Sequence, residues 1–179
     1  MGPIGWVKRQ PLAAFIAIAY LFPWLLWSYL LLTTPPGALL EHGPTPVFLV
    51  VALLGGTGPS LAGLVVSGVV DGRPGLRGLW RALGRRQAGL GGLALALFLV
   101  PLVTLTVFAL YAAAGRPLSL GDLPARLGLG IMWPIFSSLG EEFGWRGFAL
   151  PRLQSRYRPF AGTLAIGLLW GMWHLPADY

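Results

Sequence analysis

Long runs of apolar residues dominate the chain, and short charged or turn-forming stretches separate them. The runs are continuous rather than alternating, so they predict helices and not strands. A helix needs about 20 apolar residues to cross a bilayer, and in lipid it satisfies its own backbone polar groups. Five runs approach this length, at about residues 11–32, 46–70, 90–114, 127–150 and 160–179. The pattern therefore predicts an all-α protein, a polytopic transmembrane helix bundle with about five membrane segments.

The composition supports an integral membrane protein in contact with membrane lipid. Of the 179 residues, 55% are hydrophobic and 11% are charged, whereas soluble domains carry about 25% charged residues. The chain has no cysteine, which rules out a disulfide framework, a thiol nucleophile and a cysteine metal site. No repeat, linker or low-complexity tract divides it. We therefore expect a single integral membrane domain over residues 1–179.

The basic residues predict the orientation of the chain in the membrane. They lie at the ends of apolar runs, so the net charge of +7 indicates topology and contact with lipid headgroups, with no nucleic-acid partner. Lys8 and Arg9 precede the first run, and more arginines fill residues 71–89 and 151–159. The positive-inside rule then predicts a cytoplasmic N-terminus, with the chain in the cell (plasma) membrane. Within residues 71–89 arginines recur every four residues, which also predicts a short amphipathic helix on the membrane surface.

Three charged residues fall inside the fourth apolar run: Glu141, Glu142 and Arg146. An ionisable residue in a membrane costs about 2.5–3.5 kcal/mol by insertion scales and so indicates a function. Glu142 stands four residues before Arg146, which is the favoured helical ion pairing. Glu141 is turned by about 100° from Glu142 and is left without a local partner. A carboxylate in apolar surroundings accepts a proton readily near neutral pH. A purely structural ion pair beside a hydrated Glu141 remains the alternative.

A histidine in the next apolar run shifts the balance towards chemistry. His174 lies inside the fifth run, whereas His42 lies in a loop. The stretch Arg156–Pro159 predicts a turn, and Glu141 and His174 are equally far from its centre. An antiparallel hairpin would therefore bring the two side chains to one depth in the membrane. Glycines let helices approach closely in lipid, and those expected to pack this hairpin are Gly140, Gly144, Gly147, Gly167 and Gly171.

Two motifs resemble one family of membrane enzymes. "EEFGWRG", residues 141–147, matches the EExxxR motif of the CPBP family of intramembrane proteases, which includes the type II CAAX prenyl endopeptidases and the Abi proteins. "WGMWH" resembles the second motif, FxxxH, with Trp170 in the phenylalanine place. The resemblance covers about residues 134–176. It implies that Glu141 activates the hydrolytic water, that Glu142 and Arg146 support it, and that His174 helps to bind the water or the reacting carbonyl.

The resemblance is incomplete, because the third motif of the family, a later HxxxN or HxxxD, is not found in the sequence. We therefore expect either the N-terminal part of a longer family fold or a shortened relative. A catalytic zinc usually has about three protein ligands, and Glu141 and His174 would supply two. The residues leave open a metal-free site and a site with a divalent metal. Asp178, one helical turn beyond His174, is a candidate to orient the imidazole.

Three functions are consistent with these features. The first is an intramembrane endopeptidase acting on membrane-associated, for instance prenylated CAAX-type, substrates. The second is a catalytically incomplete immunity or partner-binding protein of the same family. The third is a proton-coupled transporter, since intramembrane acids and histidines also relay protons. The sequence shows no internal repeat, which disfavours the third.

Overall fold

The computed structural model describes residues 2–84, 89–115 and 138–177. All regular secondary structure in these ranges is helical, which confirms the predicted all-α class. The described chain divides into two compact units, which are described one at a time: residues 1–83 with 134–179, and residues 84–133. The expectation of a single domain over residues 1–179 stays a prediction.

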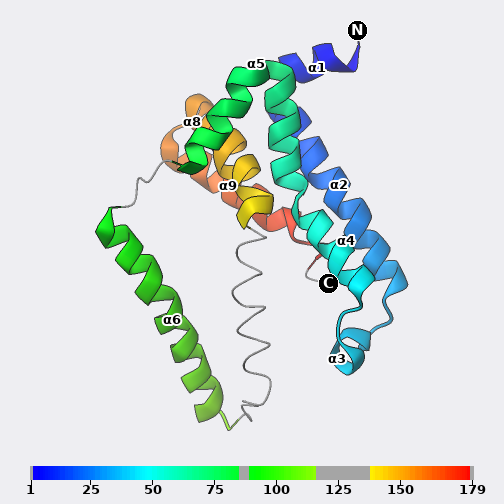
Figure 1. The fold of residues 1–179 in the computed structure, drawn as a ribbon, viewed down its shortest axis with the longest axis vertical. Helices are drawn as coiled ribbons and strands as arrows, with labels where there is room; N and C mark the ends of the chain where they lie inside the picture. The colour runs from blue at the N-terminus through cyan, green and yellow to red at the C-terminus, as the bar shows by residue number, and fades with distance from the viewer. Residues whose placement is uncertain (1, 85–88, 116–137, 178–179) are drawn as a thin grey trace. The chain divides into compact units, whose positions relative to one another are not determined.

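The first unit begins with helices α1 (Pro3–Arg9) and α2 (Pro11–Thr33) (Figure 1). A short helix α3 (Ala38–His42) leads to α4 (Pro46–Gly56) and α5 (Gly58–Gly84). Proline at the start of a helix costs no hydrogen bond, because the first amides of a helix lack an internal partner. Thr45 caps α4 by accepting a hydrogen bond from the Phe48 amide at 3.1 Å, as expected of a threonine in this position.

Within residues 2–84, 89–115 and 138–177, fewer helices pass as membrane spans than the five runs that the whole sequence predicts. Among the described residues, α2 is long and apolar enough to cross a membrane, and α4 with Gly58–Ala82 counts as a second span if a bend of 41° is allowed. The second run is broken at Thr57. The fourth run lies outside the described residues before position 138, so its full length stays a prediction. The fifth run is helical over 15 residues only.

The break at Thr57 lies where glycines bring α4 and α5 onto α2. A side chain at Gly55 would place its Cβ 2.2 Å from Nε1 of Trp27, and one at Gly58 would place it 2.3 Å from Cγ of Pro23. No Cβ atom fits at such distances, so both positions require glycine. The indole of Trp27 donates a hydrogen bond to the carbonyl of Ala52 at 3.3 Å, which adds a polar link between α2 and α4.

The arginine-rich stretch is a helix, as predicted, but it continues α5. Gly72 has a φ of 63°, a left-handed conformation that bends the helix there. Beyond it, Arg73, Arg77 and Arg81 are exposed while Leu79 is buried. The bend is tied to α8 (Leu150–Arg156) by an ion pair of 2.7 Å between Asp71 and Arg152.

The chain from residue 138 forms a helical hairpin. Residues 138–142 are α-helical, η1 (Phe143–Ala149) is a π-helix, and α8 follows without a break. The turn predicted at Arg156–Pro159 is confirmed, since α9 (Pro159–Trp173) begins there. In the hairpin, a Cβ at Gly162 would lie 3.0 Å from Cγ of Gln154. The two arms of the hairpin are therefore in close contact near the turn.

The expectation that the fifth segment continues as a helix beyond His174 is wrong. α9 ends at Trp173, and His174 is its C-terminal capping residue. Residues 174–177 form a turn in which the Ala177 amide donates to the His174 carbonyl at 2.8 Å. Pro176 accounts for the end of the helix, because the residue before a proline is disfavoured in helical conformation.

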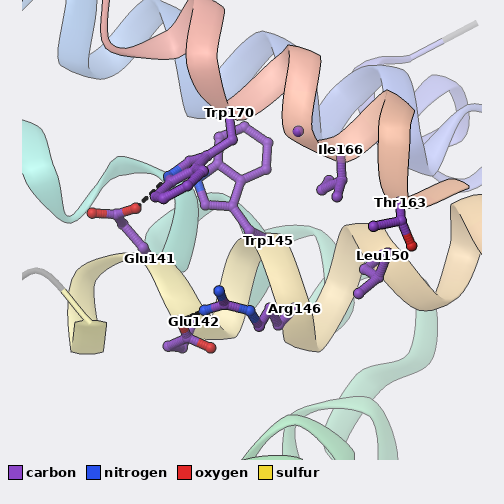
Figure 2. A pocket seen from close by; sticks show the side chains of 9 residues that line it. Glu141, Glu142, Trp145, Arg146, Leu150, Thr163, Ile166 and Trp170 are labelled. Carbon is purple, nitrogen blue, oxygen red and sulfur yellow. Dashed lines mark hydrogen bonds and ion pairs between the residues drawn. The ribbon is translucent and has the colours of Figure 1, made fainter. Parts of the chain in front are cut away.

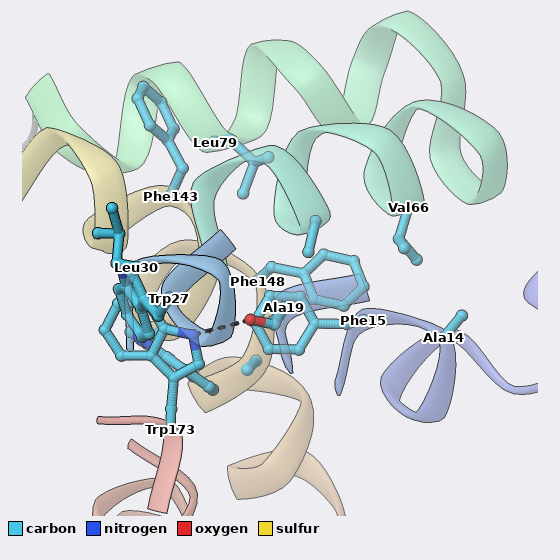
Figure 3. Close-up of a cluster of buried hydrophobic side chains, with 13 residues drawn as sticks. Ala14, Phe15, Ala19, Trp27, Leu30, Val66, Leu79, Phe143, Phe148 and Trp173 are labelled. Carbon is cyan, nitrogen blue, oxygen red and sulfur yellow. Dashed lines mark hydrogen bonds between the residues drawn. The ribbon is translucent and has the colours of Figure 1, made fainter. Parts of the chain in front are cut away.

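Aromatic side chains hold the hairpin against α2 (Figure 3). The ring of Phe15 stacks on Phe148, with 5.2 Å between centroids, and meets Trp145 edge-on at 5.3 Å. The Trp173 indole donates to the Ala19 carbonyl at 2.8 Å. Two further hydrogen bonds join the same helices, from Trp24 to the Trp173 carbonyl and from Tyr20 to the Leu169 carbonyl. The end of α9 is thus fixed to α2 by packing and by hydrogen bonds.

The glycines of the fourth segment pack against α4 and α5. A Cβ at Gly144 would lie 2.1 Å from the Pro59 carbonyl oxygen, and one at Gly140 would lie 2.5 Å from the Gly56 carbonyl oxygen. The predicted role of Gly167 and Gly171 in the hairpin is wrong, since a Cβ at either would meet nothing within 4 Å. Nearly every apolar segment here contains glycine, so the sequence alone did not tell which glycines face a helix.

The second unit contains α6 (Leu90–Ala113), which confirms the third predicted run almost to the residue. Thr106 accommodates its hydroxyl inside this apolar helix by donating a hydrogen bond to the Leu102 carbonyl at 2.8 Å. This local bond removes the need for a polar partner outside the helix.

Candidate functional site

The ion pair predicted within the fourth segment is present. Glu142 Oε1 accepts a hydrogen bond from Nη1 of Arg146, one turn further along the helix. Glu142 lies at the end of the α-helical residues and Arg146 lies inside η1. π-Helical turns of this kind are rare and occur frequently at functional sites. Arg146 is largely exposed, so Glu142 and Arg146 neutralise each other at the surface and not in the hydrophobic core.

Glu141 has a partner that the sequence did not predict. The indole Nε1 of Trp170, on α9, donates a hydrogen bond of 2.5 Å to Oε2 of Glu141 (Figure 2). The expectation that Glu141 lacks a partner therefore holds for its own helix only. The side chain is half-buried, and its second oxygen, Oε1, accepts no hydrogen bond within the described residues. One oxygen of the carboxylate is thus held in place and the other is available.

His174 lies close to this carboxylate. Trp170, which donates to Glu141, also contacts the imidazole ring of His174 edge-on, with 5.3 Å between the ring centroids. Nδ1 of the imidazole lies 2.9 Å from the Trp170 carbonyl oxygen. A carbonyl can only accept, so in the neutral ring Nδ1 carries the proton and Nε2 keeps its lone pair. Trp170 thereby does for the ring what was expected of Asp178, which lies outside the described residues.

The two arms of the hairpin enclose an open hollow of about 210 Å³. One wall is formed by Glu141, Glu142, Trp145 and Arg146, and α9 contributes Ile166 and Trp170 to the other. The hollow therefore collects three of the four predicted site residues beside aromatic and aliphatic surface. His174 is not part of its lining but lies one turn from Trp170.

The contacts of two tryptophans in the site were not predicted from the sequence, although Trp170 was recognised as part of the second motif. Trp145 stands four residues after Glu141, and Trp170 stands four residues before His174. Residues four apart share a helix face, so the spacing was a usable signal. The side chain of Trp145 is 4% exposed, and its Nε1 has no hydrogen-bond partner among the described residues.

The described residues contain no cluster of three histidine, aspartate or glutamate side chains that could hold a metal ion. Glu141 and His174 remain the two candidate ligands in this part of the chain.

Comparison with known proteins gives a family-model match at the C-terminal end of the given sequence and a short match to a curated relative. Residues 122–179 match the family model described as "Type II CAAX prenyl endopeptidase Rce1-like". The predicted resemblance to the CPBP family is confirmed. This Rce1-like segment contains the hollow, both glutamates, Arg146 and His174. Proteins of this family are integral to membranes, in agreement with the apolar helix α2.

A 36-residue stretch is 50% identical to "CAAX prenyl protease 2" from Methanococcus maripaludis. The stretch covers 20% of this chain and 13% of that relative. The chain thus aligns with a small part of the curated relative. No solved structure matches the chain.

Proposed function

We propose that this protein is an intramembrane endopeptidase that hydrolyses peptide bonds of membrane-associated substrates, with prenylated CAAX-type peptides as the substrate class. The observation that carries the proposal is the Glu141 carboxylate at the edge of the hollow, held by Trp170, whose carbonyl oxygen contacts His174. The similarity of residues 122–179 to the type II CAAX prenyl endopeptidases supports the reaction class. Besides the peptide substrate, the proposed partner of the protein is membrane lipid.

In the proposed reaction Glu141 is the general base. Its Oε1 takes a proton from a water molecule, and the water oxygen attacks the carbonyl carbon of the scissile peptide bond. As the tetrahedral intermediate collapses, the C–N bond breaks and the proton passes from Glu141 to the leaving amine. One hydrogen bond from Trp170 leaves the carboxylate basic while fixing its direction.

The other predicted site residues have supporting roles in this scheme. Nε2 of His174 offers a lone pair to the attacking water or, when protonated, a donor to the reacting carbonyl. The Glu142–Arg146 pair keeps its part of the wall near neutral, so that it does not oppose the negative charge that develops on the reacting carbonyl oxygen. These roles place the chemistry on the face shared by η1 and α9.

The experiment that tests the proposal compares membranes carrying wild type with membranes carrying Glu141→Gln. The substrate is a prenylated peptide ending in a CAAX sequence, and the readout is release of the C-terminal tripeptide. We expect release by wild type and none above background by the variant. Wild-type membranes that bind the peptide without cleaving it would favour the catalytically incomplete, partner-binding alternative.

Trp170→Phe is expected to lower kcat/KM by about 10- to 100-fold, since a hydrogen bond to a charged group contributes about 1.5–3 kcal/mol. Phenylalanine keeps an aromatic ring in place but cannot donate to Glu141. Trp170 is 43% exposed, and Trp6 on α1 is 45% exposed, so Trp6→Phe is a matched control that should leave kcat/KM unchanged. Equal rates for wild type and Trp170→Phe would show that the bond to Glu141 does not serve catalysis.

A further inference from the structure

Within the part of the chain that the structure describes, the indole of Trp145 is a buried hydrogen-bond donor without an acceptor. It is 4% exposed, and its Nε1 has no partner among the described residues. The four other tryptophans whose indole bonds are described, Trp24, Trp27, Trp170 and Trp173, each donate to an oxygen atom. Buried donors in proteins are nearly always paired, and an exception calls for an explanation such as an absent ligand.

The position of Trp145 indicates where that acceptor would lie. The side chain lines the hollow together with Glu141 and Trp170 (Figure 2). Its ring packs edge-on against Phe15 at 5.3 Å and against Trp173 at 6.1 Å, measured between ring centroids. Phe15 and Trp173 occupy part of the ring's surroundings, and the hollow is the open space beside the ring from which an acceptor can approach. Nε1 itself is buried, so the approach requires a small shift of the side chains around it.

The chemistry of the hollow narrows the choice of ligand. An indole N–H donates and cannot accept, so the ligand must present an oxygen with a free lone pair. The two carboxylates that line the hollow would repel an anion, and Arg146 is already paired with Glu142. A neutral carbonyl oxygen satisfies these conditions, and a peptide bond supplies one.

Resting on the proposed function, we propose that Trp145 Nε1–H donates a hydrogen bond to the carbonyl oxygen of the scissile peptide bond. When water adds to that carbonyl, its C=O π electrons move onto the oxygen, which becomes negatively charged. A fixed donor stabilises this oxyanion more than it stabilises the starting carbonyl and thereby accelerates the reaction. Glu141 and Trp145, four residues apart on one wall, then act on the water and on the carbonyl of the same peptide bond.

The test removes the N–H and keeps the ring. Benzothienylalanine, in which sulfur replaces the indole N–H, is introduced at position 145 of the full chain. We expect a drop of about 10²- to 10³-fold in kcat, the usual cost of losing one oxyanion donor, with a smaller change in KM. The same replacement at Trp173, whose N–H donates to Ala19 outside the hollow, is the matched control and should change thermal stability but not kcat. Unchanged kcat at position 145 would overturn the proposal.

Parallel assays separate this inference from the proposed function. If wild type does not cleave the prenylated peptide, the proposed function fails. If wild type cleaves it, Glu141→Gln does not and the benzothienyl variant retains full kcat, the inference about Trp145 alone fails. A substrate with a thioamide at the scissile position adds a check, because sulfur is a weaker acceptor. The rate loss on thio substitution should be larger in wild type than in the variant, and equal losses would contradict the bond.

A spectroscopic measurement keeps the inference testable if the variant does not fold. In wild type with nitrogen-labelled tryptophan, addition of a non-cleavable prenylated peptide should move the Trp145 indole N–H resonance downfield, as expected of a new hydrogen bond. Trp173 provides an internal reference that should not move. A Trp145 resonance that stays in place at saturating peptide, or that already shows a strong bond to water without peptide, would overturn the proposal.

Discussion

Gly144→Ala is expected to unfold a large part of the protein. The added Cβ would lie 2.1 Å from the carbonyl oxygen of Pro59 and 2.3 Å from its carbonyl carbon. Both atoms belong to the backbone of α5, so relief requires the two helices to separate. Overpacking usually costs about 1–3 kcal/mol, and we expect a loss at or above the upper end of that range because no flexible side chain can yield. The measurement is the free energy of unfolding in mild detergent.

Gly167→Ala is the matched control for this prediction. A Cβ at Gly167 meets nothing within 4 Å, and alanine favours a helix over glycine by about 1 kcal/mol. The control should therefore unfold at the same or a slightly higher denaturant concentration than wild type. Similar losses of unfolding free energy in both variants would mean that the close approach of Gly144 to Pro59 is not the cause of the destabilisation.

Glu141→Gln is expected to reduce the rate of peptide hydrolysis by about 10²- to 10⁴-fold, the usual contribution of a general base. Glutamine has nearly the same shape and its amide oxygen can still accept the hydrogen bond from Trp170. It cannot take up a proton from water. The variant should therefore fold and bind substrate as wild type does, and the loss should appear in kcat.

Glu41→Gln is the control that separates this effect from a general loss of negative charge. Glu41 is exposed in α3, with His42 at 3.8 Å, and lies outside the hollow. We expect unchanged kcat for this variant. Activity that survives in Glu141→Gln, or a comparable loss in Glu41→Gln, would remove Glu141 from the role of base.

Local pattern was sufficient to predict several parts of the structure. The first and third apolar runs form helices with nearly the predicted bounds, because runs longer than 20 residues have few alternatives as α-helices. The pair Glu142–Arg146 depends on a spacing within one helix and was predicted for that reason. The hairpin turn at Arg156–Pro159 was also predicted, since proline starts α9 there.

Contacts between distant segments could not be predicted in the same way. The sequence suggested that glycines of the fourth segment face the fifth, whereas Gly140 and Gly144 pack against Gly56 and Pro59. Which face of a helix meets which neighbour depends on the whole bundle, and small residues occur on several faces. The hydrogen bond between Trp170 and Glu141 joins residues 29 positions apart and is likewise a product of packing.

The π-helix is the local feature that the pattern missed. The prediction for the fourth segment assumed 3.6 residues per turn throughout, but Phe143–Ala149 adopts the wider π-turn. This widening changes the direction of every side chain after Phe143, including Trp145. Counting helical turns at 3.6 residues each could therefore not predict that the Trp145 indole lacks an acceptor among the described residues. The spacing of four residues between Glu141 and Trp145 could be read from the sequence.

In the proposed reaction water, made nucleophilic by Glu141, attacks the peptide carbonyl directly. This step is tested by a single turnover in heavy-oxygen water, with enzyme in excess over the prenylated peptide. We expect one labelled oxygen in the new carboxylate of the product from this first turnover. Product that carries no label would instead mean that a carboxylate of the protein had attacked the peptide first, and would exclude direct attack by water.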